Sequence, residues 1–288
     1  MIKDGCQWPF MKGGKSLFES MKIRWFTLMG IIFTLIVIIG ASLLWGPEFL
    51  EDDIVLDLIV SYTILGIFPL VWFYRQFGKQ GKTFADVMSF EKVGSYLSDI
   101  FFITLALILF SVGTFWLLGY ILSFLLPQYV EWLLAIEDDM PRHILPWLMS
   151  AVYLSFIGPV VEELIFRGLL LKRLGKKVNM TFSIIVTNIL FGILHMDLFG
   201  AFVFGFIASL LYLHSGNLLV PILVHIFNNL FVTVLMAINP PMPHFLTYET
   251  ISALRSYYIP HVLILAITIP VLFVYIRKYI PALTSKNR

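Results

Sequence analysis

The stretch Gly158-Pro-Val-Val-Glu-Glu-Leu-Ile-Phe-Arg167 places two adjacent carboxylates and a guanidinium inside an apolar run long enough to cross a membrane. An ionisable group at bilayer depth costs roughly 3 kcal/mol even on the gentlest scale, so such groups usually serve a function. Glu163 and Arg167 stand four residues apart and are predicted to pair on one helical face. Glu162 points about 100° away around the helix and has no such local partner. We therefore expect different roles for the two acids, and a distorted helix at Gly158-Pro159.

The composition is that of a helical membrane protein. Hydrophobic residues make up 59% of the 288 residues and charged residues 13%, whereas soluble domains carry about 25% charge. The mean hydropathy is +0.89. The apolar runs are about 20 residues long, which favours transmembrane helices over the short alternating strands of a barrel. The predicted fold is an all-α polytopic membrane protein, with residues 1–288 forming one integral membrane domain. The eight predicted spans are about 25–45, 54–74, 100–125, 146–170, 181–198, 200–215, 218–238 and 259–277.

Loop charges orient these spans. Basic residues cluster before the first span and after the second, fourth and eighth, while acidic residues gather in the loops of the opposite side. The positive-inside rule then predicts a multi-pass protein of the cell membrane with both termini cytoplasmic. The basic residues are dispersed over several loops, so the net charge of +2 does not indicate a nucleic-acid partner. The basic residues are Lys12, Lys15, Lys22, Arg24, Arg75, Lys79, Lys82, Lys172, Arg173, Lys176, Lys177, Arg277, Lys278, Lys286 and Arg288. The acidic ones are Glu48, Glu51, Asp52, Asp53, Glu131, Glu137, Asp138 and Asp139.

Two further polar elements lie in predicted spans. His195 follows Asn188 by seven residues, which puts both on one helical face. His225 and Asn229 are four residues apart and project together from a later span. Each element alone is also typical of hydrogen bonding between helices. Counting about 1.5 Å per residue from the span ends places Glu162 and both histidines near mid-bilayer, where they can meet. A carboxylate, two imidazoles and an amide are suited to activating water for attack on an acyl group.

Other catalytic motifs are missing from the sequence. It contains no HExxH helix of a zinc protease and no serine nucleophile elbow. The lone Cys6 is far from the polar elements. Glycine-rich phosphate loops are also missing, which argues against a nucleotide-dependent enzyme.

The three polar elements occur in a fixed order that resembles a known set of motifs. Glu162-Glu163-x-x-x-Arg167, Phe191-x-x-x-His195 and His225-x-x-x-Asn229 each fall in a predicted span. Together they resemble the motifs of the CPBP family of CAAX-prenyl-protease-2-like (Rce1-type) and bacteriocin-processing or bacteriocin-immunity intramembrane proteases. The resemblance covers about residues 146–238, the predicted protease core. It implies an eight-helix fold with an intramembrane active site that hydrolyses a peptide bond.

The resemblance also implies roles for single residues. Glu162 with His195 would hold and activate the attacking water, and His225 with Asn229 would form the oxyanion hole. The second glutamate and the arginine of the first motif would support them. The family has been described both as metal-independent glutamic proteases and as metalloproteases. No metal cofactor is favoured, because Asn229 is a poor zinc ligand but a good hydrogen-bond donor. A zinc site would instead consist of Glu162, His195 and His225.

The expected partners are the lipid bilayer and a membrane-associated protein or peptide substrate, of which a prenylated CAAX protein is one class. Two other functions stay open. One is a non-catalytic immunity or scaffold protein of the same fold. The other, less favoured, is a proton-coupled transporter, since buried Glu and His also form proton relays. Only one Gly-Pro interruption lies beside the polar elements, and no second half of the sequence matches it, whereas transporters commonly have inverted repeats.

Overall fold

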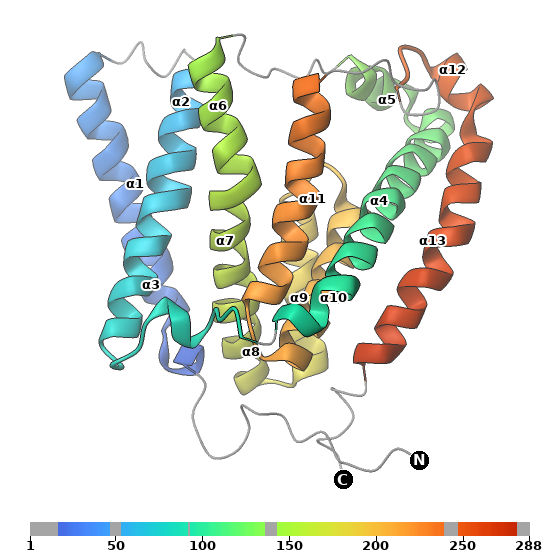
Figure 1. The fold of residues 1–288 in the computed structure, drawn as a ribbon. Helices are drawn as coiled ribbons and strands as arrows, with labels where there is room; N and C mark the ends of the chain where they lie inside the picture. The colour runs from blue at the N-terminus through green and yellow to red at the C-terminus, as the bar shows by residue number, and fades with distance from the viewer. Residues whose placement is uncertain (1–16, 47–52, 92, 136–142, 239–246, 281–288) are drawn as a thin grey trace, which may run out of the picture.

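The computed structural model describes residues 17–46, 53–91, 93–135, 143–238 and 247–280, and all regular elements within these ranges are helices (Figure 1). Seven helical stretches in this part of the chain are long and apolar enough to cross a membrane. A further apolar helix, α9 (Met180–Ile193), is shorter. In chain order these helices correspond to the eight predicted spans, so the all-α polytopic fold is confirmed.

Several of the spanning stretches are built from more than one helical segment. The second joins α2 (Asp53–Ile59) to α3 (Phe68–Gly78) through a π-helical segment, Val60–Ile67. The fourth runs through α6 (Ile144–Val152), α7 (Gly158–Glu163) and α8 (Leu171–Lys177), with π-helical segments at Tyr153–Ile157 and Leu164–Leu170. The others are α1 (Ile23–Trp45), α4 (Leu97–Leu125), α10 (Leu198–Ser215), α11 (Leu219–Ile238) and α13 (Tyr258–Tyr279). Two short helices, α5 (Pro127–Leu134) and α12 (Ile251–Ser256), lie beside one end of α4.

The helix α9 is too short to cross the membrane by itself. Its 14 residues extend about 21 Å at 1.5 Å per residue, against roughly 30 Å of hydrocarbon. The prediction carried this helix to residue 198, but it ends at Ile193 because the next helix already begins at Leu198. Asp197 caps that next helix by accepting a hydrogen bond from the N–H of Gly200 at 2.9 Å. Packed together, α9 and α10 form a hairpin whose tip carries His195.

The bundle packs most tightly around α10 and α4. In α10, 56% of the spanning window is buried, compared with 6% in α1. The long helix α4 contacts α10, α11 and α13. By contrast, within the described residues α1 packs mainly against α3 and the π-helical segment Val60–Ile67, and it stands at one edge of the molecule (Figure 1). The outer face of α1 is thus left to lipid, and its inner face is available to line a groove.

The first and last described helices lie consistently with an even number of crossings. In Figure 1, α1 begins and α13 ends at the same end of the bundle. An even number of crossings puts both of these helix ends on one side of the membrane. This holds whether or not α9 crosses completely, because α9 and α10 together return the chain to the side from which α9 began. Assignment of that end to the cytoplasm stays a prediction from loop charge.

Candidate active site

The helix that carries both glutamates is interrupted by π-helical turns on each side of them. The N–H of Gly158 bonds to the carbonyl of Tyr153, five residues back, so the wider turn accommodates Pro159 directly after it. The predicted distortion at Gly158-Pro159 takes this form. A second π-helical segment starts directly after Glu163. Such segments are frequent at functional sites, because each one shifts the direction in which the following side chains point.

Glu163 and Arg167 form the predicted ion pair. Nη1 of Arg167 lies 3.0 Å from Oε1 of Glu163, and both side chains are fully buried. The guanidinium lies 4.4 Å from the centroid of the Phe191 ring, so it gains a cation–π contact as well. Breaking a buried pair by removing one partner costs about 3–5 kcal/mol. This arrangement therefore fixes the first motif rigidly inside the bundle.

Glu163 has a second partner that the sequence did not indicate. Its Oε1 also accepts a hydrogen bond from Nδ1 of His225 on α11, at 2.9 Å. A carboxylate only accepts hydrogen bonds, so Nδ1 carries the proton and Nε2 is directed away from Glu163. The imidazole is buried, with 5% of its side chain exposed. Glu163 therefore orients His225 in addition to pairing with Arg167.

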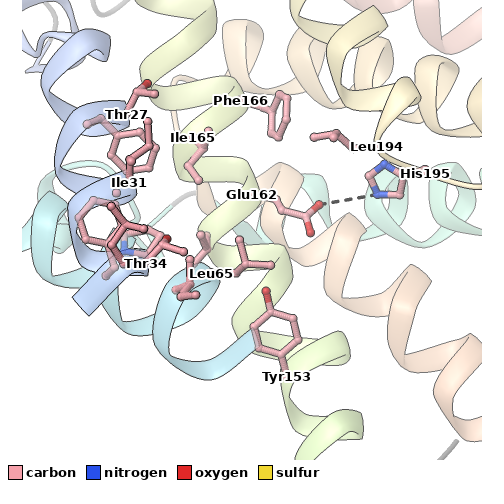
Figure 2. Close-up of a pocket in the computed structure, with 17 residues that line it drawn as sticks. Thr27, Ile31, Thr34, Leu65, Tyr153, Glu162, Ile165, Phe166, Leu194 and His195 are labelled. Carbon is pink, nitrogen blue, oxygen red and sulfur yellow. Dashed lines mark ion pairs between the residues drawn. The ribbon is translucent and has the colours of Figure 1, made fainter. Parts of the chain in front are cut away.

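Glu162 faces two imidazoles. Its Oε2 lies 3.9 Å from Nε2 of His195 and 3.8 Å from Nε2 of His225, and it has no direct hydrogen-bond partner in the described residues. Nδ1 of His195 donates to the carbonyl of Phe191 at 2.7 Å, which directs Nε2 toward the carboxylate (Figure 2). These separations exceed a direct hydrogen bond. They suit one water molecule bonded to the carboxylate and to an imidazole.

The amides of α11 lie beside this group. Asn229 donates to the carbonyl of Leu154 at 2.9 Å, and its Oδ1 accepts from Asn228 at 3.2 Å. Leu154 belongs to the π-helical segment before α7. Asn229 is thus held against the helix that carries Glu162, with one amide N–H still available to a ligand.

A large apolar groove ends at Glu162 and His195. Its volume is about 720 Å³, and it runs between α1, the α2–α3 stretch and α7 (Figure 2). Thr27, Ile31 and Thr34 line it from α1. Among the described elements, α1 packs mainly against the α2–α3 stretch, so no close packing between α1 and α7 fills the groove. An apolar ligand can therefore approach the carboxylate sideways from the lipid.

A smaller polar cavity lies on the other side of His195. Its volume is about 200 Å³, and His225, Asn228 and Asn229 also line it. Ser111 on α4 and Asp197 complete its polar lining and are hydrogen-bonded to each other. Asp197 lies in the turn between α9 and α10, and the sequence gives no sign that this turn faces the site. His195 lines both cavities, so an extended chain passing it would reach from the apolar groove into the polar one.

The spacing of the three acceptor atoms bears on metal binding. Ligands of a tetrahedral zinc ion, each about 2.0–2.1 Å from the metal, lie about 3.3 Å apart. Glu162 is 3.9 Å and 3.8 Å from the two imidazole nitrogens. Within the described residues no group of three or more His, Cys, Asp or Glu has an arrangement suited to a metal ion. In this geometry the residues of the predicted zinc alternative therefore stand farther apart than the ligands of a tetrahedral zinc ion.

The comparisons with known proteins find similarity in the motif-bearing region. Residues 144–231 match the family model described as "Type II CAAX prenyl endopeptidase Rce1-like". YdiL of Bacillus subtilis (strain 168), which is named as a membrane peptidase, is 36% identical over 89 residues. The "Membrane-embedded CAAX protease MroQ" of Staphylococcus aureus (strain USA300) is 31% identical over 100 residues. Residues 144–231 are therefore similar to an Rce1-like CAAX protease domain, and the predicted resemblance to the CPBP family is confirmed.

These similarities are confined to one part of each chain. The matches cover 30% and 31% of this chain, and 36% and 39% of the length of YdiL and MroQ, respectively. The chain thus matches little more than a third of each relative. No solved structure matches. All six residues of the predicted site lie between 144 and 231, whereas α1, which lines the groove, lies outside the matched region.

Proposed function

We propose that this protein is an intramembrane endopeptidase that hydrolyses a peptide bond of a membrane-associated protein or peptide. The observation that carries the proposal is Oε2 of Glu162. It is buried, has no direct hydrogen-bond partner among the described residues, and faces two imidazoles at the end of the apolar groove. A glutamate that only joined helices would be paired through at least one oxygen, as Glu163 is through Oε1. A carboxylate left in this state is suited to acting as a general base.

The proposed reaction begins with a water molecule between Glu162 and His195. Glu162 takes a proton from the water as its oxygen attacks the carbonyl carbon of the substrate. When the C–N bond breaks, the proton passes to the departing amine nitrogen. The atoms of one water are thereby divided between the two products, and Glu162 is regenerated.

The negative charge that develops on the carbonyl oxygen needs donors placed beforehand. Asn229 offers its remaining amide N–H. His225 already donates Nδ1–H to Glu163, so its Nε2 donates to the oxyanion only when the ring carries both protons. The Glu163 carboxylate stabilises that imidazolium. No step in this reaction is routed through a metal ion, and the acceptor atoms stand farther apart than the ligands of a tetrahedral zinc ion.

The substrate class follows from the two cavities. The apolar groove accepts a hydrophobic segment or a lipid chain, of which a prenyl group on a CAAX-type protein is one form. The polar cavity accepts the part of the chain beyond the scissile bond. The names of the relatives, a membrane peptidase and a CAAX protease, support this assignment.

A cleavage assay tests the proposal. The purified protein in detergent is given a library of quenched fluorescent peptides, each tethered through an apolar helix or a farnesyl chain. Glu162→Gln keeps the shape of the side chain and loses the base, so turnover should fall by about 10²-fold or more. Glu249→Gln makes the same chemical change at an exposed position remote from both cavities and should leave turnover unchanged. Turnover by Glu162→Gln equal to that of an active Glu249→Gln refutes the assignment, and a wild-type protein that cleaves nothing in the library favours a scaffold or transporter.

A further inference from the structure

Arg167 has donors that the first motif does not use. One guanidinium nitrogen, Nη1, binds Glu163, whereas Nε and Nη2 are buried and have no partner among the described residues. The rings of Phe166, Phe191 and Phe204 surround the guanidinium and keep it from water. A buried donor without a partner costs about 1–3 kcal/mol, and more when it is charged. The free N–H groups of Arg167 therefore need a hydrogen-bond acceptor.

Asn188 on α9 carries the complementary group. Its side chain is fully buried, and its Nδ2 donates to the carbonyl of Ile184 at 2.7 Å and to Oγ of Ser209 at 3.1 Å. Because a carbonyl can only accept, the amide nitrogen must face Ile184, which fixes the orientation of the amide group. Oδ1 of Asn188 is buried and has no partner in the described part of the chain.

Gly205 shows that these two groups face the same point. A Cβ placed on Gly205 would lie 2.4 Å from Oδ1 of Asn188 and 2.9 Å from Nη2 of Arg167. Any side chain on α10 at this position would therefore force the two groups apart. With glycine here, no side chain of α10 stands between the acceptor of Asn188 and the free donor of Arg167.

We propose that Asn188 is a positioning residue of the active site, with Oδ1 as the acceptor that holds Nη2 of Arg167. This inference rests on the proposed protease function. Asn188 lines neither cavity, so it acts only through other residues. Asn188 would fix the guanidinium of Arg167. Nη1 of that guanidinium binds Oε1 of Glu163, and the same Oε1 accepts the hydrogen bond from the ring of His225. These contacts link four segments to Nε2 of His225, the atom proposed to face the substrate. The segments are α9, the π-helical segment Leu164–Leu170, α7 and α11.

The competing explanation is that Asn188 only joins α9 to α10 through Ser209. The two explanations predict opposite orders of activity for two substitutions. Asn188→Leu removes the acceptor, whereas Asn188→Asp keeps an oxygen before Arg167 and loses the donors to Ile184 and Ser209. If Asn188 positions Arg167, the Asp variant retains most of its kcat and the Leu variant loses roughly 10–100-fold, because small displacements at an active site are costly. A purely structural residue gives the reverse, since the Asp variant then loses both bonds and buries a charge.

Two further variants complete the experiment. Ser209→Ala removes a partner of Nδ2 but leaves Oδ1 unaffected, so its kcat should stay within about twofold of wild type, whereas kcat of Gly205→Ala should fall as in Asn188→Leu. In both impaired variants KM should be unchanged, because neither residue lines a cavity. An Asn188→Leu protein that folds and retains full kcat overturns the proposal, as does an Asp variant less active than Leu.

A readout independent of activity separates this inference from the proposed function. Thermal unfolding in detergent is measured for Asn188→Leu, Arg167→Met and the double variant. If the two side chains interact, the double variant is at least as stable to heat as the less stable of the two single variants. Additive losses overturn the proposed contact even if the protein is an active protease. If the stability losses are coupled but the wild-type protein cleaves nothing in the library, the contact stands and only the protease assignment is removed.

Discussion

Removing one charge of the buried Glu163–Arg167 pair is expected to damage stability and activity in separable ways. Glu163→Gln leaves a guanidinium buried without its carboxylate, and Arg167→Met leaves a carboxylate without its guanidinium. Because both side chains are fully buried, each single variant should lose about 3–5 kcal/mol of folding free energy. The double variant removes both charges, and replacing a buried pair by uncharged groups of similar size is often nearly neutral. We therefore expect the double variant to be more stable than either single variant, with a coupling of at least about 2 kcal/mol.

Activity should not follow stability in this series. Glu163 also orients the ring of His225, and the double variant lacks that carboxylate. The kcat of the double variant should therefore be roughly 10²-fold below that of the wild-type protein, although the variant is folded. Unfolding is followed by tryptophan fluorescence, and kcat by the tethered-peptide assay. Additive stability losses would show that the pair contributes little. A double variant that regains full activity would show that Glu163 does not act through His225.

Four further outcomes are expected. Asn229→Ala should lower kcat by about 10²–10³-fold with little change in KM, as measured by steady-state kinetics, because it removes an oxyanion donor. Activity should survive chelators, and elemental analysis of the active protein should find no stoichiometric zinc; reversible loss on chelation would reassign the histidines as ligands. Thr34→Trp should fill the groove and raise KM severalfold, whereas Ile39→Trp, exposed on the same helix and outside the groove, should not. Cysteine labelling should reach Lys176→Cys from the cytoplasm and Glu131→Cys from outside, and the opposite pattern would invert the topology.

The parts of the site that lie within one helix were predictable from the sequence. Helical geometry places Glu163 and Arg167 one turn apart on the same face, and in the structure the two charged groups are 3.0 Å apart. The same geometry puts His225 and Asn229 on one side of α11, where both line the polar cavity. Long apolar runs likewise predicted the spans, because hydrocarbon thickness sets helix length independently of how the helices pack.

The parts that depend on packing between helices were not predictable from spacing. Glu163 and His225 are 62 residues apart, and their contact depends on how α7 meets α11. His195 and Asn188 were expected on one helical face, but α9 ends at Ile193, so His195 lies in the turn and Asn188 faces α10. The cap that Asp197 provides for α10 decides where that turn falls. The groove requires α1, which the motifs do not include.

The difference between the two adjacent glutamates follows from which way the helix turns them. Glu163 faces the closed interior, where Arg167 and His225 satisfy the same oxygen. Glu162 faces the end of the groove with 33% of its side chain exposed. A buried charge is tolerable when it is paired, and a base is useful only when it is unpaired. One residue therefore stabilises the site and the other is left to react, and both requirements act through His225, which contacts the first acid directly and lies 3.8 Å from the second.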